Sequence, residues 1–204
     1  MKKLLVMAAA AAALSAPLAA QAQTSLGLRL GYAFAGGELT EGVDLSDWSK
    51  SNVPLQADLL FTVNPQLKLG FYGSYGFAQM GNDLDDSCDA FGYDCSQSIV
   101  RLGVQAQYSF LTPPGSAQPW IGAGTGWEWN NTEIEGHDAD ASGWELLNLQ
   151  GGVDWKVGQS FTAGPFAMWS IGRYSDSSGD AAGEIVDETI HHWFEIGIRG
   201  TFGM

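Results

Sequence analysis

The sequence predicts an all-β fold: an eight-stranded antiparallel up-and-down β-barrel that spans a membrane. Three observations lead to this prediction. Apolar side chains alternate with small or polar ones in eight separate segments, and no 3.6-residue period competes with that alternation. The connections between the segments alternate between short and long. The chain has 27 Gly among its 204 residues, and only 16% of the residues are charged.

The N-terminus has the pattern of a cleaved secretory signal peptide. A basic start and an almost unbroken apolar run over 4–14 precede Pro17, and the small residues Ala20 and Ala22 follow as the expected cleavage site. A membrane anchor is the alternative, but the run is short for a span of about 20 residues. We therefore expect residues 1–22 to be removed and one mature domain to cover 23–204.

Eight strands are expected from the alternation. In the first, Leu26, Leu28 and Leu30 share one face, opposite Gly27 and Arg29. The expected strands cover residues 25–34, 53–63, 67–77, 100–110, 121–129, 147–157, 161–174 and 193–202. Such lengths suit a tilted strand that crosses a bilayer in about 9–11 residues. Pro165 predicts a bulge or a register change in the seventh strand.

The connections indicate two different rims. Short turns rich in Pro, Gly or Ser are expected at 64–66, 111–118 and 158–160, and long polar loops at 36–52, 79–97, 130–142 and 175–189. Most of the 23 acidic residues lie in the four long segments. Short periplasmic turns and long outer loops are typical of transmembrane β-barrels.

The polar face of the strands decides which side faces lipid. On a soluble barrel it would be the outer surface and densely charged, but here it carries mainly Gly, Gln, Ser and Thr. Small side chains fit the crowded lumen of an eight-stranded barrel. Aromatic residues cluster toward strand ends, as interfacial girdles would: Tyr32, Phe34, Phe77, Tyr108, Phe110, Trp127, Trp129 and Trp155. A secreted soluble barrel, with its apolar face inward, is the alternative.

Charged residues in the strands predict a plugged lumen. Buried charges persist only when they are paired, so acids and bases on the inward face should form an ion-pair network. The expected members are Arg29, Asp58, Lys68, Arg101, Glu128, Asp154, Lys156, Glu195 and Arg199. Leu60, Trp120 and Trp193 on the same face leave part of the lumen apolar.

The mature chain resembles the small outer-membrane β-barrels that include OmpA-like transmembrane domains and OmpW-like barrels. The resemblance rests on the signal peptide, the strand opening at 119–124, Gly164-Pro165-Phe166 and the ending at 195–202. Gly197 and Phe202 in that ending resemble the signal read by the barrel-assembly machinery. The ending departs from that signal at Gly200, where a second hydrophobic residue is usual, and in the Gly203-Met204 that follows the aromatic residue.

The resemblance implies a monomer in the outer membrane of a Gram-negative cell envelope. Outer-membrane lipid, lipopolysaccharide and the barrel-assembly machinery are the implied partners. The acidic outer loops are a further candidate surface for divalent cations.

Cys88 and Cys95 lie in the second long loop with six residues between them. The periplasm is oxidising, so an exported chain should join them in a disulfide. A metal site at the pair is the weaker alternative because no His lies nearby.

The same loop matches a calcium loop in part, through Asp83, Asp85, Ser87, Asp89 and Asp94. Cys88 stands where such a loop needs its turn Gly, and the last ligand is Asp rather than Glu. A solvated acidic loop is the favoured interpretation, and no metal is expected.

Enzymatic activity is not expected. The lipid A deacylases that resemble this fold use a His-x-Ser pair, but His137 is followed by Asp138 and Ala139. His191 and His192 are adjacent and should point to opposite faces of a strand. No cofactor motif occurs, and an acidic chain with a pI near 4.3 argues against nucleic-acid binding.

Two functional classes therefore remain. The first is a structural or surface-interaction barrel with acidic outer loops and a largely plugged lumen. The second is a narrow channel for uptake of small or hydrophobic solutes, as the OmpW-like resemblance allows. Charge balance in the lumen favours the first class.

Overall fold

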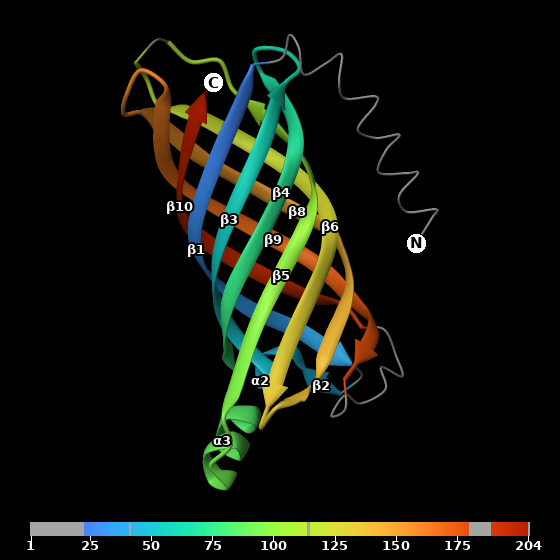
Figure 1. The fold of residues 1–204 in the computed structure, drawn as a ribbon. Coiled ribbons are helices and arrows are strands. Elements are labelled where there is room, and N and C mark those ends of the chain that lie inside the picture. Colours follow the sequence, from blue (N-terminus) through green and yellow to red (C-terminus); the bar gives the residue numbers. More distant parts are fainter. Residues whose placement is uncertain (1–22, 41, 114, 180–188, 204) are drawn as a thin grey trace.

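The computed structural model describes residues 23–40, 42–113, 115–179 and 189–203. Eight long strands in this part of the chain form one closed barrel (Figure 1). They are β1 (Thr24–Thr40), β3 (Ser49–Thr62), β4 (Leu67–Met80), β5 (Cys95–Ser109), β6 (Gln118–Ile134), β8 (Asp140–Lys156), β9 (Phe161–Ser178) and β10 (His191–Gly203). The predicted signal peptide, with Ala20 and Ala22, lies outside the described residues and stays a prediction.

Each barrel strand pairs antiparallel with its neighbour in the chain, and the last strand pairs with the first. The β1–β10 ladder runs from Ser25 opposite Gly203 to Gly37 opposite His191. This pairing closes the sheet, so the barrel strands expose no open edge. The predicted up-and-down antiparallel topology is confirmed.

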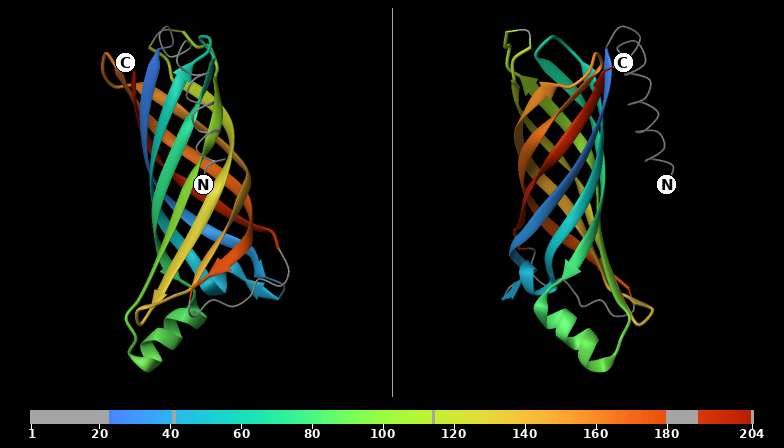
Figure 2. Two further views of the ribbon diagram at one scale, coloured as in Figure 1. Left: turned by 45° about the vertical axis from the view of Figure 1, so that its right-hand side comes forward. Right: turned by 90° about the vertical axis from the view of Figure 1, so that its left-hand side faces the viewer.

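The two rims differ as predicted. The short connections join strands at the end where β1 begins and β10 ends, whereas the longer connections lie at the opposite end (Figure 2). The longer connections contain β2 (Val43–Asp44), β7 (His137–Asp138) and the helices α2 (Leu45–Trp48) and α3 (Asn82–Phe91). Neither of these two helices is long and apolar enough to cross a membrane.

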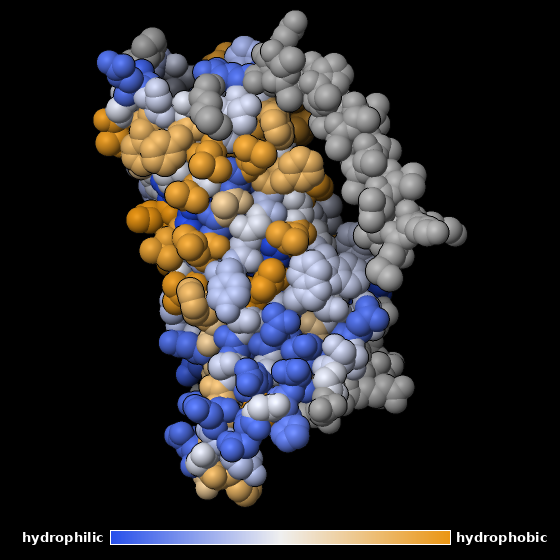
Figure 3. All heavy atoms as spheres, in the orientation of Figure 1, coloured by the Kyte–Doolittle hydropathy of each residue, from blue (hydrophilic) through white to orange (hydrophobic). Residues whose placement is uncertain are grey.

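The apolar face of the strands points outward. Along β5, Leu102 and Val104 are exposed, whereas Arg101 and Gln105 on either side of them are buried in the lumen. Figure 3 shows hydrophobic side chains over the part of the barrel nearer the short turns, and mainly hydrophilic ones toward the loop end. An outer wall of this kind would be costly in water, and it matches the lipid-facing band of a transmembrane barrel.

Aromatic contacts mark both edges of this band. Near the short turns, the ring centroids of Phe161 and Phe202 are 4.6 Å apart. Toward the loops, Tyr32 contacts Phe34 at 4.9 Å, and Trp127 contacts Trp144 at 5.2 Å. The positions fit the predicted girdles.

The third long loop was predicted wrongly. Most of 130–142 continues the barrel strands: β6 ends at Ile134 and β8 begins at Asp140. A tight turn at Glu135 and Gly136 connects β6 to β7, with φ values of 51° and 79°. The polar composition suggested a loop, but a ladder that projects beyond the bilayer can carry polar residues on both faces.

The predicted bulge at Pro165 is also wrong. Pro165 lies opposite Ile198 in an unbroken register with β10. On the β8 side, the ladder has a gap next to Pro165: Gly152 pairs with Phe166 and Trp155 pairs with Ala163, and no residues pair between them. The register of the two strands is the same on both sides of this gap. The missing N–H of Pro165 is therefore tolerated without a shift.

The register shifts occur elsewhere, in the pairings β1–β2, β3–β4, β6–β8 and β8–β9. One shift in the β8–β9 pairing lies between Glu145 and Leu147, and both Leu146 and Leu147 are exposed. This shift turns Glu145 into the lumen, whereas a strict alternation from Leu147 would place it on the lipid face.

Candidate functional site

Two groups of polar side chains fill the lumen at different heights. The first, called the turn-side cluster, is centred on Arg29, whose Nε lies 2.6 Å from Asp58 Oδ2. Gln56 and Gln105 each donate a hydrogen bond of 2.8 Å to Asp58 Oδ1. Arg29 Nη1 also donates to Gln150. The ion pair therefore has its remaining donors and acceptors met by amides, which a buried pair requires.

A second arginine completes the turn-side cluster. Arg199 binds the Asp154 carboxylate with two nitrogens, its Nε at 2.9 Å from Oδ1. Its Nη1 donates to Gln107 Oε1 at 2.8 Å. Trp120 lies beside both arginines, with its ring centroid 3.5 Å from Arg199 Cζ and 5.5 Å from Arg29 Cζ. The indole and the two guanidinium groups thus pack together in the lumen at this height.

The second group, called the loop-side cluster, is centred on Glu128. Its Oε2 lies 2.5 Å from Arg101 Nε. Its Oε1 accepts a hydrogen bond from Tyr174 and lies 3.1 Å from His191 Nε2. Trp193 Nε1 donates to the same oxygen at 3.4 Å. One carboxylate thereby ties together four strands, β5, β6, β9 and β10.

The loop-side cluster carries more acid than base. Arg101 interacts electrostatically with Glu128, Glu145 and Glu195, all buried. Tyr72 donates to Glu145 Oε2. Glu145 Oε1 and Glu195 Oε2 are buried without a hydrogen-bond partner in the described part of the protein. Arg101 therefore forms an ion pair with one of the three buried carboxylates, Glu128, and lies close enough to influence the other two electrostatically.

Six of the nine predicted lumen residues form ion pairs: Arg29–Asp58, Arg101–Glu128 and Arg199–Asp154. Lys68 is half-buried and donates to Ser25 Oγ at 3.1 Å. Glu195 lies in the lumen as predicted, but no base lies within ion-pair distance of it among the described residues. Lys156 was placed wrongly, because it is the last residue of β8 and its side chain is exposed at the turn rim.

Other lumen residues were missed or given no role. The alternation places Tyr72 on the same face as Lys68, but nothing in the sequence indicates its bond to Glu145 on another strand. Tyr174 and His191 stack with ring centroids 4.2 Å apart and share Glu128. The alternation could have placed these two side chains inside, but their common partner depends on the registers of four strands.

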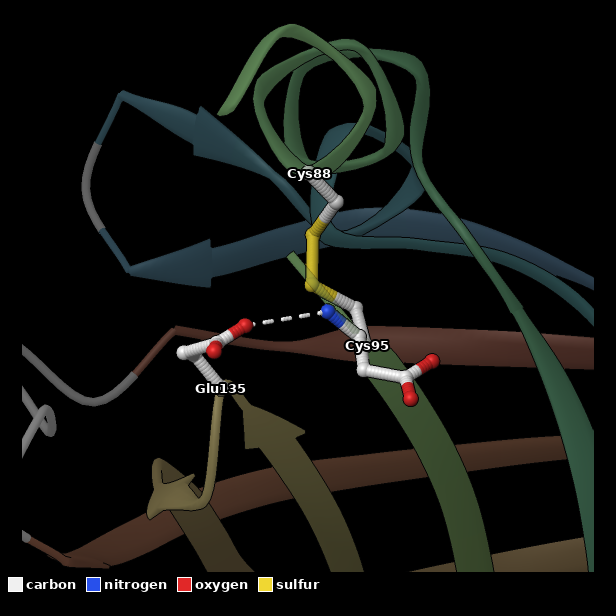
Figure 4. Close-up of a disulfide and its surroundings, with 4 residues drawn as sticks. Cys88, Cys95 and Glu135 are labelled. Atoms are coloured by element: carbon white, nitrogen blue, oxygen red, sulfur yellow. Dashed lines mark hydrogen bonds between the residues drawn. A yellow bond between two sulfur atoms is a disulfide. The ribbon is translucent and has the colours of Figure 1, made fainter. Parts of the chain in front are cut away.

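The predicted disulfide between Cys88 and Cys95 is formed, with the two Cα atoms 6.4 Å apart. It joins α3 to the start of β5 (Figure 4). Beside it, the Asp94 N–H donates to Glu135 Oε2 at 3.3 Å, the contact dashed in Figure 4. The disulfide and this bond attach the tip of α3 to the β6–β7 turn.

The calcium-loop alternative does not fit the structure. Asp83, Asp85, Ser87 and Asp89 lie in the helix α3 rather than in an open loop. A helix distributes alternate residues around its axis, whereas a calcium loop folds them around one ion. No group of three or more His, Cys, Asp or Glu residues suited to a metal occurs in the described ranges.

The ending that was predicted as the assembly signal lies in β10. A side chain at Gly197 would approach Leu30 O to 2.3 Å, so the close contact with β1 needs glycine. Phe202 packs against Phe161 at the turn rim. The geometry gives both residues a place in the barrel, and recognition by the assembly machinery stays a prediction.

The closed eight-stranded barrel with an apolar outer wall and a polar, packed lumen is the fold of small outer-membrane β-barrel proteins. Solved structures of this class are similar to the chain. Neisserial surface protein A superposes with a TM-score of 0.57 at 12% identity, over 86% of this chain and 95% of the other. A major outer membrane protein from Thermus thermophilus gives 0.51 at 11% identity, over 89% and 99%. Neither a protein-family model nor a curated protein sequence matches the chain.

Proposed function

We propose that this chain is an integral outer-membrane protein, exported through the periplasm, with a closed lumen and a role in envelope structure or surface interaction. The observation that carries the proposal is the turn-side cluster. In it Trp120 packs against Arg29 and Arg199, each arginine forms an ion pair with an aspartate, and together these side chains block the lumen. A lumen of this diameter leaves room only for side chains. The surface available to partners is then the loop end, and lipid and lipopolysaccharide cover the outer wall.

A narrow channel is the competing function. It was supported at first by Leu60, Trp120 and Trp193, which were expected to leave an apolar path. All three are almost fully buried, and Trp120 and Trp193 lie beside arginines rather than along an opening. This packing favours the closed barrel. We also propose that the chain is not an enzyme, because His191 is buried against Glu128 and Tyr174.

Planar-bilayer conductance tests the closed lumen. The folded wild-type protein should give no discrete channels. Trp120→Ala should produce openings, because it removes the ring that lies between Arg29 and Arg199. Trp155→Ala, which removes a lipid-facing ring near the same end of the barrel, is the matched control and should stay silent. Regular openings of the wild type would refute the closed barrel and favour the channel.

A further inference from the structure

The tip of α3 exposes two stacked aromatic rings far from the lipid band. Phe91, the last residue of the helix, and Tyr93 have ring centroids 5.4 Å apart and an interplanar angle of 21°. They are 70% and 46% exposed. In Figure 3 the hydrophobic atoms at this tip are separated from the apolar band by a wide hydrophilic region. Membrane lipid therefore does not explain why the rings are exposed.

The backbone holds the rings in place. Gly92 ends the helix in the left-handed conformation, with φ of 69°. Its N–H donates to Asp89 O at 3.2 Å, and the Tyr93 N–H donates to Cys88 O at 2.9 Å. The Cys88–Cys95 disulfide closes the same segment. A pre-organised aromatic pair loses little entropy on binding, which is the property of an interaction hot spot.

An acidic groove begins at Asp94, the residue that follows Tyr93 in the chain. The groove has a volume of about 450 Å³ and is lined by Asp94, Cys95, Ser96, Glu133, Glu135 and Gly136. It lies between the start of β5 and the β6–β7 turn. Mutual hydrogen bonds between Asp94 and Glu135 fix its walls: Glu135 N–H donates to Asp94 O at 3.0 Å, and Asp94 N–H donates to the Glu135 carboxylate. Three acidic residues thus line the groove, and one of them, Asp94, directly follows Tyr93 in the chain.

We propose that this tip binds an arginine-containing cationic peptide segment of a partner protein. A guanidinium group stacks well on aromatic faces and forms paired hydrogen bonds with carboxylates. The segment closed by the disulfide supplies the two rings and Asp94, and the end of β6 and the β6–β7 turn add Glu133 and Glu135. The chain has a net charge of −14, and this negative charge attracts a cationic partner. The inference deepens the proposed surface-interaction role and depends on it.

Fluorescence anisotropy of a labelled hexa-arginine peptide tests the proposal on the folded, full mature chain in detergent. The wild type should bind this peptide more tightly than hexa-lysine and should not bind hexa-glutamate. The double variant Phe91→Ala/Tyr93→Ala should weaken binding by about tenfold, since two cation–π contacts are lost. Glu133→Gln/Glu135→Gln should weaken binding and reduce its dependence on salt.

Leu111→Ala is the matched control, because Leu111 is 72% exposed but lies beyond the end of β5 on the turn side. It should bind like the wild type. Cys88→Ser/Cys95→Ser should weaken binding, while a heat-modifiability gel shows that the barrel is still folded.

Wild-type affinity in Phe91→Ala/Tyr93→Ala would overturn the proposal, since it would leave only diffuse attraction to acidic loops. Tip-dependent binding of neutral phosphatidylcholine vesicles, or tip-dependent dimers in sedimentation, would overturn it in favour of a lipid surface or a second copy. A silent bilayer together with absent peptide binding would reject this inference alone, whereas open wild-type channels would reject the proposed closed barrel.

Discussion

Arg101→Met is expected to lower the free energy of unfolding by about 3–5 kcal/mol. The substitution keeps an apolar stem of similar length in the lumen but removes the cation that interacts with Glu128, Glu145 and Glu195. Glu128 would then lose its ion pair with arginine while Glu145 and Glu195 stay buried in the same cluster. Removing one partner of a buried ion pair lowers the free energy of unfolding by more than the intact pair contributes, because the remaining charges stay desolvated.

Urea unfolding of the protein in lipid vesicles, followed by Trp fluorescence, measures this loss. Lys156→Met is the matched control, because Lys156 is a base of the same barrel whose side chain is exposed at the rim. It should change the free energy by less than about 0.5 kcal/mol. Equal stability of the two variants would show that Arg101 does not hold the loop-side cluster together.

Val104→Arg is expected to destabilise the barrel in a bilayer by about 2–4 kcal/mol. Val104 is 48% exposed and points outward from the middle of β5. It lies between Tyr108, near the turn rim, and Leu102, which pairs with Trp127 of the loop-side girdle. A guanidinium group at this depth must lie in hydrocarbon or distort the bilayer.

The cost should depend on depth. Val157→Arg introduces the same change just beyond the end of β8, where the side chain is exposed at the turn rim, and should cost about 0–1 kcal/mol. The same unfolding assay compares the two variants. A soluble barrel with an exposed outer wall would tolerate both equally, so equal small effects would argue against the lipid-facing orientation.

The regular parts of this fold follow from local chemistry, and the exceptions depend on pairing between strands. Alternation places Arg29, Asp58, Arg101 and Glu128 on one face, because a strand turns successive side chains to opposite sides. Glu145 is an exception to this rule, since the register of β8 shifts next to it in the pairing with both β6 and β9. No single-strand pattern contains that information.

The loops were harder to predict than the barrel for a related reason. Asp, Gly and Ser over 79–97 indicated a polar loop, and the disulfide followed from export and spacing. The helix at Asn82–Phe91 was missed because six of its ten residues are Asn, Asp or Ser, which favour turns and helix caps over helix interiors. The exposed aromatic pair at the end of this helix, Phe91 and Tyr93, was missed for a different reason. The sequence of a loop does not show whether an aromatic side chain is buried or exposed.

Refolding of the mature chain with and without detergent tests the central claim, that the apolar face of a closed barrel points outward. The chain is diluted from urea into buffer alone and into detergent micelles, and folding is followed by β-sheet circular dichroism and by heat-modifiable migration on gels. The structure predicts a folded, heat-modifiable barrel in micelles and aggregation in buffer. A folded, soluble monomer in buffer without detergent would contradict it, because the exposed outer wall would then be in water.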